Sequence, residues 1–348
     1  MTIQKASPKP ARTNTIGMAG ASLAGVAALI ALPYVTPSYA VSIGSLVLIA
    51  AILASAINML AGDAGLVSLG HAGIAGAAGY GLAWASRQGW DLGGQLVLAL
   101  VITLIVSMVY ALISMRTNGI FFLMITLAAG MICYGLAYRW SAVTGGDNGL
   151  VGIRRPELVA ESWQFYFLCV AAFVIVTIAL RIFSHSPVGL VLRGLRDSES
   201  RMVSLGYQVA AYKFWAVLAS GIVAGLAGVL SVWQMEFIAP NIADFQASAL
   251  PLIMIVIGGV GSLLGPAIGA VIVVLGQQVV STYFERWSLL LGLVFIVVVI
   301  FAPRGIVGAV AAASRRVRRR SAAADAPASS MRPPNSPSDP TPNPPSPE

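Results

Sequence analysis

Residues 181–213, RIFSHSPVGLVLRGLRDSESRMVSLGYQVAAYK, form the only long amphipathic segment between the hydrophobic stretches of this 348-residue chain. At about 100° per residue on a helical wheel, its apolar and polar side chains separate onto opposite sides. The pattern therefore predicts a surface helix that does not cross a bilayer. The apolar side holds Val188, Val191, Leu192, Leu195, Met202, Val203 and Leu205, and the polar side holds Arg193, Arg196, Asp197, Ser200, Arg201 and Ser204.

The ends of this helix are marked by residues typical of helix boundaries. Ser186 before Pro187 is a favourable N-cap and first helical residue, and Gly206 is a favourable stop. Gly189 and Gly194 are candidate positions for a break into two shorter pieces. We therefore expect a cytoplasmic helix that begins at Ser186 and ends at Gly206.

The charges of this helix give it two possible surroundings. Asp197 is spaced to pair with Arg193 and Arg201 at i,i+4, which would stabilise the helix in water. Glu199 falls within the apolar side, where a carboxylate without a partner is costly. A protein surface that offers hydrogen bonds to Glu199 is one interpretation, and a solvated helix drawn to lipid headgroups by its arginines is the other.

The composition indicates an all-α polytopic membrane protein, because 57% of the residues are hydrophobic, 10% are charged, and the apolar runs are long enough to cross a bilayer. The net charge of +8 is spread between spans and along the tail, which fits membrane orientation and not nucleic-acid binding.

Cys133 and Cys169 lie inside apolar runs without metal-ligand spacing, so we expect structural thiols. We expect no cleavable signal peptide, because the first apolar run is long enough to span.

The apolar runs divide the chain into three expected parts. A disordered cytoplasmic lead covers residues 1–15, a transmembrane domain covers 16–308 with the cytoplasmic helix at 186–206, and a basic, then Pro-rich, disordered tail covers 309–348. Spans are expected at 16–35, 39–60, 66–86, 94–115, 120–138, 163–183, 213–234 and 287–302.

The region 249–284 is too long for one span and short for two full ones. We interpret it as a hairpin of broken helices, or a re-entrant pair, because glycines and a proline in its middle free backbone groups that only a cavity or a neighbouring helix can satisfy. The hinge positions of this turn are Gly258, Gly259, Gly261, Gly265 and Pro266.

The distribution of basic residues predicts that both termini are cytoplasmic, with ten crossings. Three Lys and Arg residues in the N-terminal lead, Arg116, five in 181–213 and seven from Arg304 onward make 16 on the expected inner side. The other five of the 21 lie on the expected outer side, as the positive-inside rule requires.

Glycines recur at spacings that favour close helix packing. Gly221 and Gly225 form one such pair, and Gly70, Gly73, Gly76 and Gly79 form a longer series. We expect these residues to serve packing of the small-xxx-small kind more often than substrate contact. The similar segments 68–73 and 262–267 suggest two structural repeats whose broken helices flank a substrate path.

Candidate pathway residues lie in two places. Asp63 and His71 are intramembrane ionisable residues, although the interface and a helix N-terminus at the cytoplasmic start of a span could accommodate both without a function. The external loop around Thr144 has turn chemistry and is either a plain loop or a pathway mouth lined by backbone amides. The low-ranked pathway set is Ser68, His71, Thr126, Thr144, Gly145, Gly146 and Asn148.

Motifs for ATP binding and catalysis are absent from the sequence. It contains no G-x-x-x-x-G-K-[ST], no H-E-x-x-H and no G-x-S-x-G. We expect no cofactor and no enzyme activity, so any ATP-driven step must be performed by a partner.

Seven segments, taken in order, resemble the M-type inner-membrane permease subunits of ABC importers for branched-chain amino acids, over roughly residues 40–308. They are 65–72 with Tyr80, 116–122, 126–128, 144–150, 196–199 through Gly206 to 212–213, 258–261 through 265–266, and 302–305.

The resemblance implies a heteromeric importer. Its partners would be a second permease subunit, two cytoplasmic ATPases, a periplasmic binding protein and membrane lipid, with a small-molecule substrate and no nucleic acid. Residues 186–206 are then similar to the coupling helix that docks on an ATPase. The implied coupling residues are Arg196, Asp197, Glu199 and Gly206.

The chain departs from the family pattern at Gly73-Ile74, Asn118 and Met131. These departures do not affect the implied coupling role, but they weaken the inference of which solute is transported. A branched-chain amino acid is the first expectation, and urea, short amides or other amino acids are alternatives. A different class of protein, an ion-coupled secondary transporter, is suggested by the possible broken-helix repeat. A membrane-embedded enzyme lacks a nucleophile with a base, or a metal set.

Overall fold

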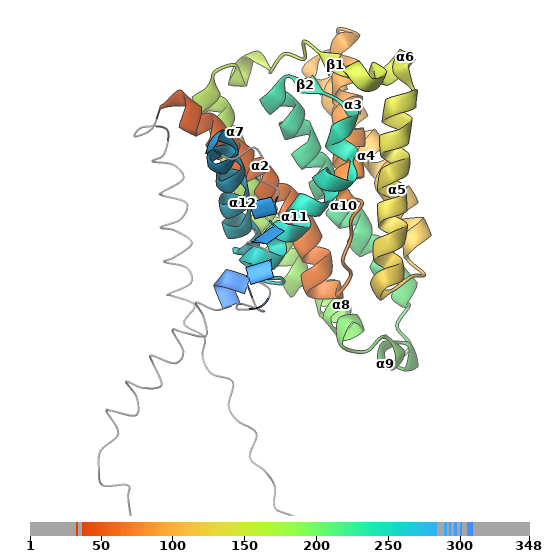
Figure 1. Cartoon of the computed structure of the whole chain (residues 1–348). Coiled ribbons are helices and arrows are strands. Elements are labelled where there is room, and N and C mark those ends of the chain that lie inside the picture. The colour runs from red at the N-terminus through yellow and green to blue at the C-terminus, as the bar shows by residue number, and fades with distance from the viewer. Residues whose placement is uncertain are drawn as a thin grey trace, which may run out of the picture. The chain divides into compact units, whose positions relative to one another are not determined.

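The computed structural model of the chain describes residues 37–283, Pro33, and the positions 289–290, 292–293, 296–297, 300 and 305–308. Within these residues nearly all of the regular structure is helical, as the all-α prediction requires (Figure 1). The expected lead 1–15 and tail 309–348 lie outside the described residues, as does the expected span 16–35 except for Pro33. Part of the expected span 287–302 also lies outside them.

The helices follow one another with short connections. The longer ones are α2 (Ser38–Met59), α3 (His71–Arg87), α4 (Leu92–Ser114), α5 (Gly119–Arg139), α7 (Ser162–His185), α10 (Val209–Met235), α11 (Phe245–Gly258) and α12 (Gly265–Tyr283). The shorter elements are the π-turn η1 (Leu60–Ala64), α6 (Ser141–Thr144), η2 (Gly146–Asn148), η3 (Glu157–Val159), α8 (Pro187–Asp197), α9 (Glu199–Ser204) and η4 (Pro240–Ala243).

Among the described residues, five helical stretches are long and apolar enough to cross a membrane: α2 with η1, α4, α5, α7 and α10. Their bounds lie within a few residues of the expected spans. The helix α3 begins later than the expected span 66–86, because residues 65–70 form a non-helical connection after η1. Gly65, with φ at +68°, makes the turn that ends η1.

The region 249–284 contains the expected hairpin, made of α11 and α12. The two helices are antiparallel, since an added Cβ at Gly258 would contact Gly265 and one at Gly269 would contact Met254. Their turn, residues 259–264, lies against the end of α2. There Asn58 donates to the Ser262 carbonyl at 3.0 Å and accepts from the Gly261 amide at 2.8 Å. Side-chain hydrogen bonds therefore satisfy backbone groups that the turn frees.

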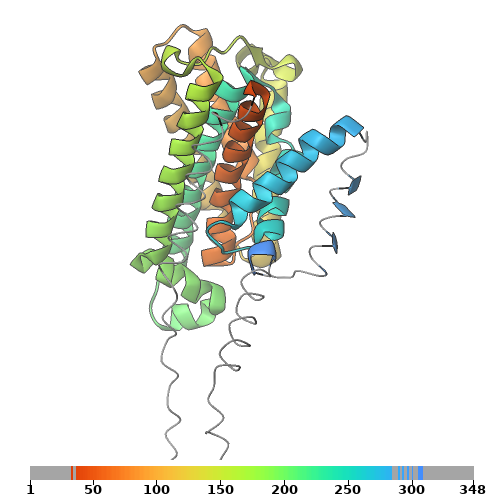
Figure 2. The same cartoon turned by 90° about the vertical axis from the view of Figure 1, so that its left-hand side faces the viewer.

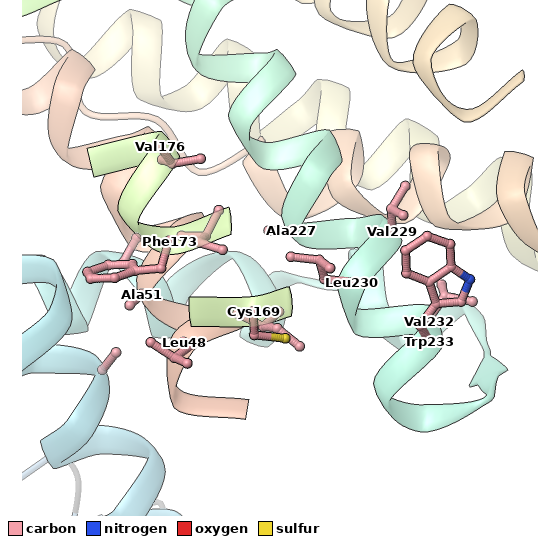
Figure 3. Close-up of a cluster of buried hydrophobic side chains, with 14 of the residues drawn as sticks. Leu48, Ala51, Cys169, Phe173, Val176, Ala227, Val229, Leu230, Val232 and Trp233 are labelled. Atoms are coloured by element: carbon pink, nitrogen blue, oxygen red, sulfur yellow. The ribbon is translucent and has the colours of Figure 1, made fainter. Parts of the chain in front are cut away.

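The hydrophobic core joins segments that are far apart in the sequence. Figure 3 shows Leu48 and Ala51 of α2 beside Phe173 of α7, with Leu230 and Trp233 of α10 nearby. All of these side chains are buried in one cluster. The core thus binds α2, α7 and α10 into one unit.

The helix α3 lies at the centre of the bundle and packs against α10, α4 and α5. Ten of its 17 residues are glycine or alanine, and most of them are buried. Small side chains allow the neighbouring backbones to approach closely. The tightest case is Gly228 of α10, where an added Cβ would lie 2.0 Å from the Ala75 carbonyl oxygen.

The two ends of the bundle differ. Figure 1 shows α8 and α9 at one end, and α6, β1 (Leu150–Val151) and β2 (Phe237–Ile238) at the other. The strands β1 and β2 are antiparallel, with Leu150 opposite Ile238. We call these the α8–α9 end and the β1–β2 end. Figure 2 shows α12 crossing the bundle at a tilt.

Gly228→Ala is expected to destabilise the protein by about 1–3 kcal/mol, because the added methyl group forces the α10 and α3 backbones apart. The measurement is the thermal unfolding midpoint in detergent. Gly135→Ala in α5 is the matched control, since an added Cβ there meets nothing within 4 Å. The control should be neutral or slightly stabilising. Equal losses in both variants would contradict the packing role of Gly228.

Candidate functional site

The predicted surface helix exists, and its two ends are those expected from the sequence. Helix α8 starts at Pro187, and the Ser186 side chain accepts from the Gly189 amide at 3.3 Å. At the other end Gly206 has φ at +85°. Its amide bonds the Val203 carbonyl, and the next amide, from Tyr207, bonds Met202. This is the Schellman arrangement that glycine permits.

The break in this helix is at Ser198, and the predicted breaks at Gly189 and Gly194 are wrong. Ser198 is extended, with φ at −165° and ψ at 104°. Its side chain accepts from the Arg201 amide at 3.4 Å, so Ser198 ends α8 and caps α9. An added Cβ at Gly194 would lie 2.8 Å from the sulfur of Met202. The glycine makes room for α9 to fold back on α8.

This break changes which apolar side chains are buried. Val191, Leu192 and Leu195 of α8 are buried against the bundle, and so is Met202 of α9. The prediction placed Val203 and Leu205 on the same buried side, yet they are 58% and 65% exposed. A continuous helical wheel loses its phase at Ser198, so Met202 stays buried while Val203 and Leu205 turn outward.

The helix α8 is bound to η1 through Arg193 and Asp63. The Arg193 guanidinium lies 3.2 Å from the Asp63 carboxylate, which also accepts from Ser184 at 2.9 Å. The predicted pairs of Asp197 with Arg193 and Arg201 are not among the ion pairs of the described residues. Arg193 instead turns toward the bundle, where a less exposed acid is available.

Arg196 makes a second connection from α8 to η1. Its guanidinium donates to the Gly62 carbonyl, and its side chain packs where a Cβ on Gly65 would lie. Opposite, an added Cβ on Gly62 would lie 2.6 Å from the Gly261 Cα. The predicted coupling residue Arg196 therefore touches η1 at the point where η1 meets the 259–264 turn. Asp197, also predicted, is exposed.

Glu199 has a partner inside the chain. Its carboxylate lies 2.9 Å from the Lys213 ammonium of α10, and Lys213 also donates to the Asn118 side chain before α5. The Lys213 side chain is 4% exposed and the Glu199 side chain is 37% exposed. The fold brings Lys213 to Glu199, so the chain itself supplies a hydrogen-bond partner for this carboxylate, and its contact with an ATPase stays a prediction. We call Glu199, Lys213 and Asn118 the Lys213 cluster.

His71 is the first residue of α3 and lies buried inside the bundle. Its exposed fraction is 1%. Its Nε2 is 2.6 Å from Ser220 Oγ, and its Nδ1 is 2.9 Å from Ser68 Oγ. Ser220 gives its single proton to the Ala56 carbonyl at 2.7 Å, so Nε2 is the donor and Nδ1 accepts from Ser68. A neutral histidine thus links α3, α10 and α2.

Thr126 joins the same region from α5. It accepts from the Leu69 amide at 3.3 Å, and an added Cβ on Gly70 would lie 2.4 Å from the Thr126 carbonyl oxygen. The structure therefore brings together three predicted pathway residues, Ser68, His71 and Thr126. Their polar groups all have hydrogen-bond partners within the protein, so at this point the cluster is a packed joint and not an open path.

The other predicted pathway residues lie at the β1–β2 end. Thr144 Oγ1 donates to the Ala137 carbonyl at 2.6 Å and accepts from Gly146 at 3.2 Å. Gly145 and Gly146 have φ at +76° and +60°. The glycines are required by the turn itself, and Asn148 closes η2 beside them.

Arg155, which the sequence did not single out, organises this end. Its guanidinium donates to the carbonyls of Trp233 at 2.6 Å and Gln234 at 3.0 Å. It also lies 3.4 Å from the Glu236 carboxylate and 4.8 Å from the centre of the Phe165 ring. The guanidinium satisfies carbonyls of the last turn of α10, which have no partner within the helix.

Two cavities flank α3 and α2. One of about 330 Å³ lies between α3, α4 and α5, and its walls include Gly76, Ala77, Tyr80, Trp140 and Thr144. Its surface is almost entirely apolar. The other, of about 210 Å³, lies near the α8–α9 end, with Asn58, Asp63 and Thr177 in its walls. Within the described residues no group of three His, Cys, Asp or Glu side chains could hold a metal ion.

Comparison with known proteins assigns the family. A sequence profile described as branched-chain amino acid transport system / permease component matches residues 39–299 of the chain. The chain belongs to this family. The resemblance drawn from the motifs is thereby confirmed. Together with the five helical stretches of the described residues that are long and apolar enough to cross a membrane, this makes the protein a multi-pass inner-membrane transport permease, which is not itself an enzyme.

Similar proteins carry related names. The chain is 26% identical over 305 residues to LivM of Salmonella typhimurium, a high-affinity branched-chain amino acid transport system permease protein, covering 80% of this chain and 72% of that protein. LivM of Escherichia coli is 25% identical over the same shares. A metal-chelate type ABC transporter solved in an inward-facing conformation aligns with a TM-score of 0.44 and 18% identity, over 75% of this chain and 86% of that chain.

Ser220→Ala is expected to destabilise the protein by about 1–3 kcal/mol, because the buried Nε2 proton of His71 loses its acceptor. Thermal unfolding in detergent measures the loss. Ser107→Ala is the matched control, since Ser107 Oγ is buried without a hydrogen-bond partner among the described residues. That variant should be neutral or stabilising. A stable Ser220→Ala variant would show that the histidine joint contributes little.

Proposed function

We propose that this chain is a transmembrane permease subunit of an ABC importer, which moves a branched-chain amino acid from a periplasmic binding protein to the cytoplasm by ATP-driven alternating access. The observation that carries the proposal is the attachment of α8 and α9. Three polar connections, from Arg193, Arg196 and Glu199, hold this helix pair on the bundle while Val203 and Leu205 face outward.

A helix pair with this attachment suits a coupling element. Its inner side contacts η1, α7 and α10, so a force applied to the outer side reaches several elements at once. Its outer side offers apolar residues beside the exposed Asp197 and Arg201. Mixed apolar and charged surfaces of this kind fit a groove on a protein better than lipid. We assign that groove to a cytoplasmic ATPase.

The topology that accompanies this function has ten crossings and cytoplasmic termini. The excess of Lys and Arg on the side of residues 181–213 supports this orientation. The α8–α9 end is then cytoplasmic and the β1–β2 end periplasmic, with 1–15 and 309–348 as disordered cytoplasmic segments. Two helix–turn–helix units with connections 65–70 and 259–264 support a pair of structural repeats.

The assembly would contain a second permease subunit, two ATPases and a periplasmic binding protein. The ATPases would close on ATP and push α8 and α9, which would switch the path from outward to inward opening. The pathway residues that we assign are Thr144, Gly145, Gly146 and Asn148 at one end, and Ser68, His71 and Thr126, whose packed joint closes the path in this structure. In this mechanism the solute crosses the membrane without any covalent change.

The apolar cavity beside α3 favours a solute with an aliphatic part. Urea has no apolar portion to bury, whereas the side chain of leucine, isoleucine or valine would gain free energy from such walls. The cavity lies between helices that meet at the β1–β2 end, which we assign to the periplasm. Urea, short amides and other amino acids are the competing solutes.

Isolation of the whole complex tests the proposed class. Affinity purification of this chain in mild detergent should co-isolate two ATP-binding chains and a second permease. Proteoliposomes that contain this complex and its binding protein should take up labelled leucine only when ATP is supplied.

Uptake by the chain without ATPases would contradict the importer class, and so would its abolition by an ionophore while ATP hydrolysis continues. A complex that hydrolyses ATP and takes up urea in preference to leucine would keep the class and overturn the solute.

Ala77→Phe is expected to lower leucine uptake about tenfold while lowering alanine uptake less, because the phenyl ring fills the cavity that would accept the longer aliphatic chain. Competition between labelled leucine and unlabelled alanine measures the change. Ala128→Phe, at an exposed position of α5, is the matched control. Equal loss for both solutes would show that the cavity does not discriminate between them.

A further inference from the structure

We propose that Lys213 is a positioning residue that makes α9, α10 and the start of α5 move as one unit, so that motion of α9 reaches the first turn of α3 by two routes. The inference deepens the proposed function by naming the residue through which the coupling element acts. It rests on the Lys213 cluster and on the packed joint at Ser68, His71 and Thr126.

The Lys213 cluster holds together because a buried ammonium needs acceptors. The Lys213 side chain is almost fully buried, and Glu199 and Asn118 supply its acceptors among the described residues. A buried charge without partners is strongly unfavourable. If α9 moves, α10 and the start of α5 must therefore follow, or the ammonium is left unpaired.

The first route follows α10. Ser220 lies seven residues after Lys213, which is two helical turns or about 10 Å along the same face. At that point Ser220 links the His71 ring to the Ala56 carbonyl. A shift of α10 caused at Lys213 is thus transmitted to the first residue of α3.

The second route follows α5. Thr126 lies eight residues after Asn118, about 12 Å along the helix, and Phe122 between them is fully buried on the same face. Thr126 accepts from the Leu69 amide, which comes just before α3. Both routes therefore end within residues 68–71.

The joint at the start of α3 is closely packed at Gly70. An added Cβ on Gly70 would lie 2.4 Å from both the Thr126 carbonyl oxygen and the Tyr110 ring. Closely packed elements shift between discrete arrangements and do not deform continuously. Motion of α5 and α10 must consequently reposition α3, which forms a wall of the apolar cavity.

The first test measures hydrogen exchange at the packed joint itself and does not depend on transport activity. In the purified full-length complex, Lys213→Met should speed hydrogen exchange in peptides that cover 66–74 by about tenfold, since local opening becomes easier. Glu199→Gln, which keeps a neutral acceptor for Lys213, should give a smaller increase and serves if Lys213→Met does not assemble.

The charge-swap double variant Glu199→Lys with Lys213→Glu tests whether the ion pair itself is required, or whether any polar residue at position 213 would be enough. The swap restores the ion pair, and the Asn118 amide can donate to a carboxylate as readily as it accepts from an ammonium. Exchange at 66–74 should return to the wild-type rate. Glu236→Gln removes one carboxylate of an ion pair at the β1–β2 end and should leave exchange at 66–74 unchanged.

A second readout separates positioning from folding. In proteoliposomes, Lys213→Met should lower uptake per ATP hydrolysed about tenfold while the ATPases still co-purify, and the swap should restore most of it. Unchanged exchange at 66–74 in both single variants, or an increase that the swap does not reverse, would overturn the inference. Absence of ATP-driven uptake in the wild-type complex would overturn the proposed function and leave the exchange test intact.

Discussion

Close backbone contact around α3 is the constraint on which the rest of the bundle depends. The Gly and Ala residues of α3 let α10 approach until Gly228 touches the Ala75 carbonyl, and they let α4 and α5 close in from other sides. Such contact gives dispersion energy without long side chains, and it excludes water. Polar groups at the start of α3 must then bond one another. That requirement explains why Ser68, His71 and Ser220 form one network, and why Thr126 accepts from the neighbouring Leu69 amide.

The same constraint divides the molecule into parts with different freedom. The α2, α7 and α10 core is held by large apolar side chains, whereas the α8–α9 end adds to its buried apolar residues three charged connections, two to η1 and one to α10. Apolar packing resists sliding, while ion pairs and hydrogen bonds to carbonyls can exchange partners. A chain of the permease family needs both rigid apolar packing and exchangeable polar contacts, because a path must open between helices that stay folded.

Much of the fold could be predicted from sequence, because its signals are local. Span length, the Ser186 cap, the Gly206 stop and the glycine turn of α11 and α12 each depend on neighbouring residues. The Lys213 cluster could not be predicted, since Asn118 lies 95 residues before Lys213 in the chain. The helical wheel also assumed one continuous helix through Ser198. It therefore placed Val203 and Leu205 on the buried face, although both are exposed. The partners of His71 could not be predicted either, since Ser220 lies 149 residues later in the chain.

Arg155 has a consequence for how the bundle can move. One side chain bonds two carbonyls of α10, Glu236 and the Phe165 ring, and the β1–β2 ladder fastens the same loops together. The ends of α10 and α7 are thereby clamped at a single point. A fixed point at one end of two helices favours rotation about that point, so any displacement of α7 and α10 is expected to be smallest near Arg155 and to grow toward the opposite end.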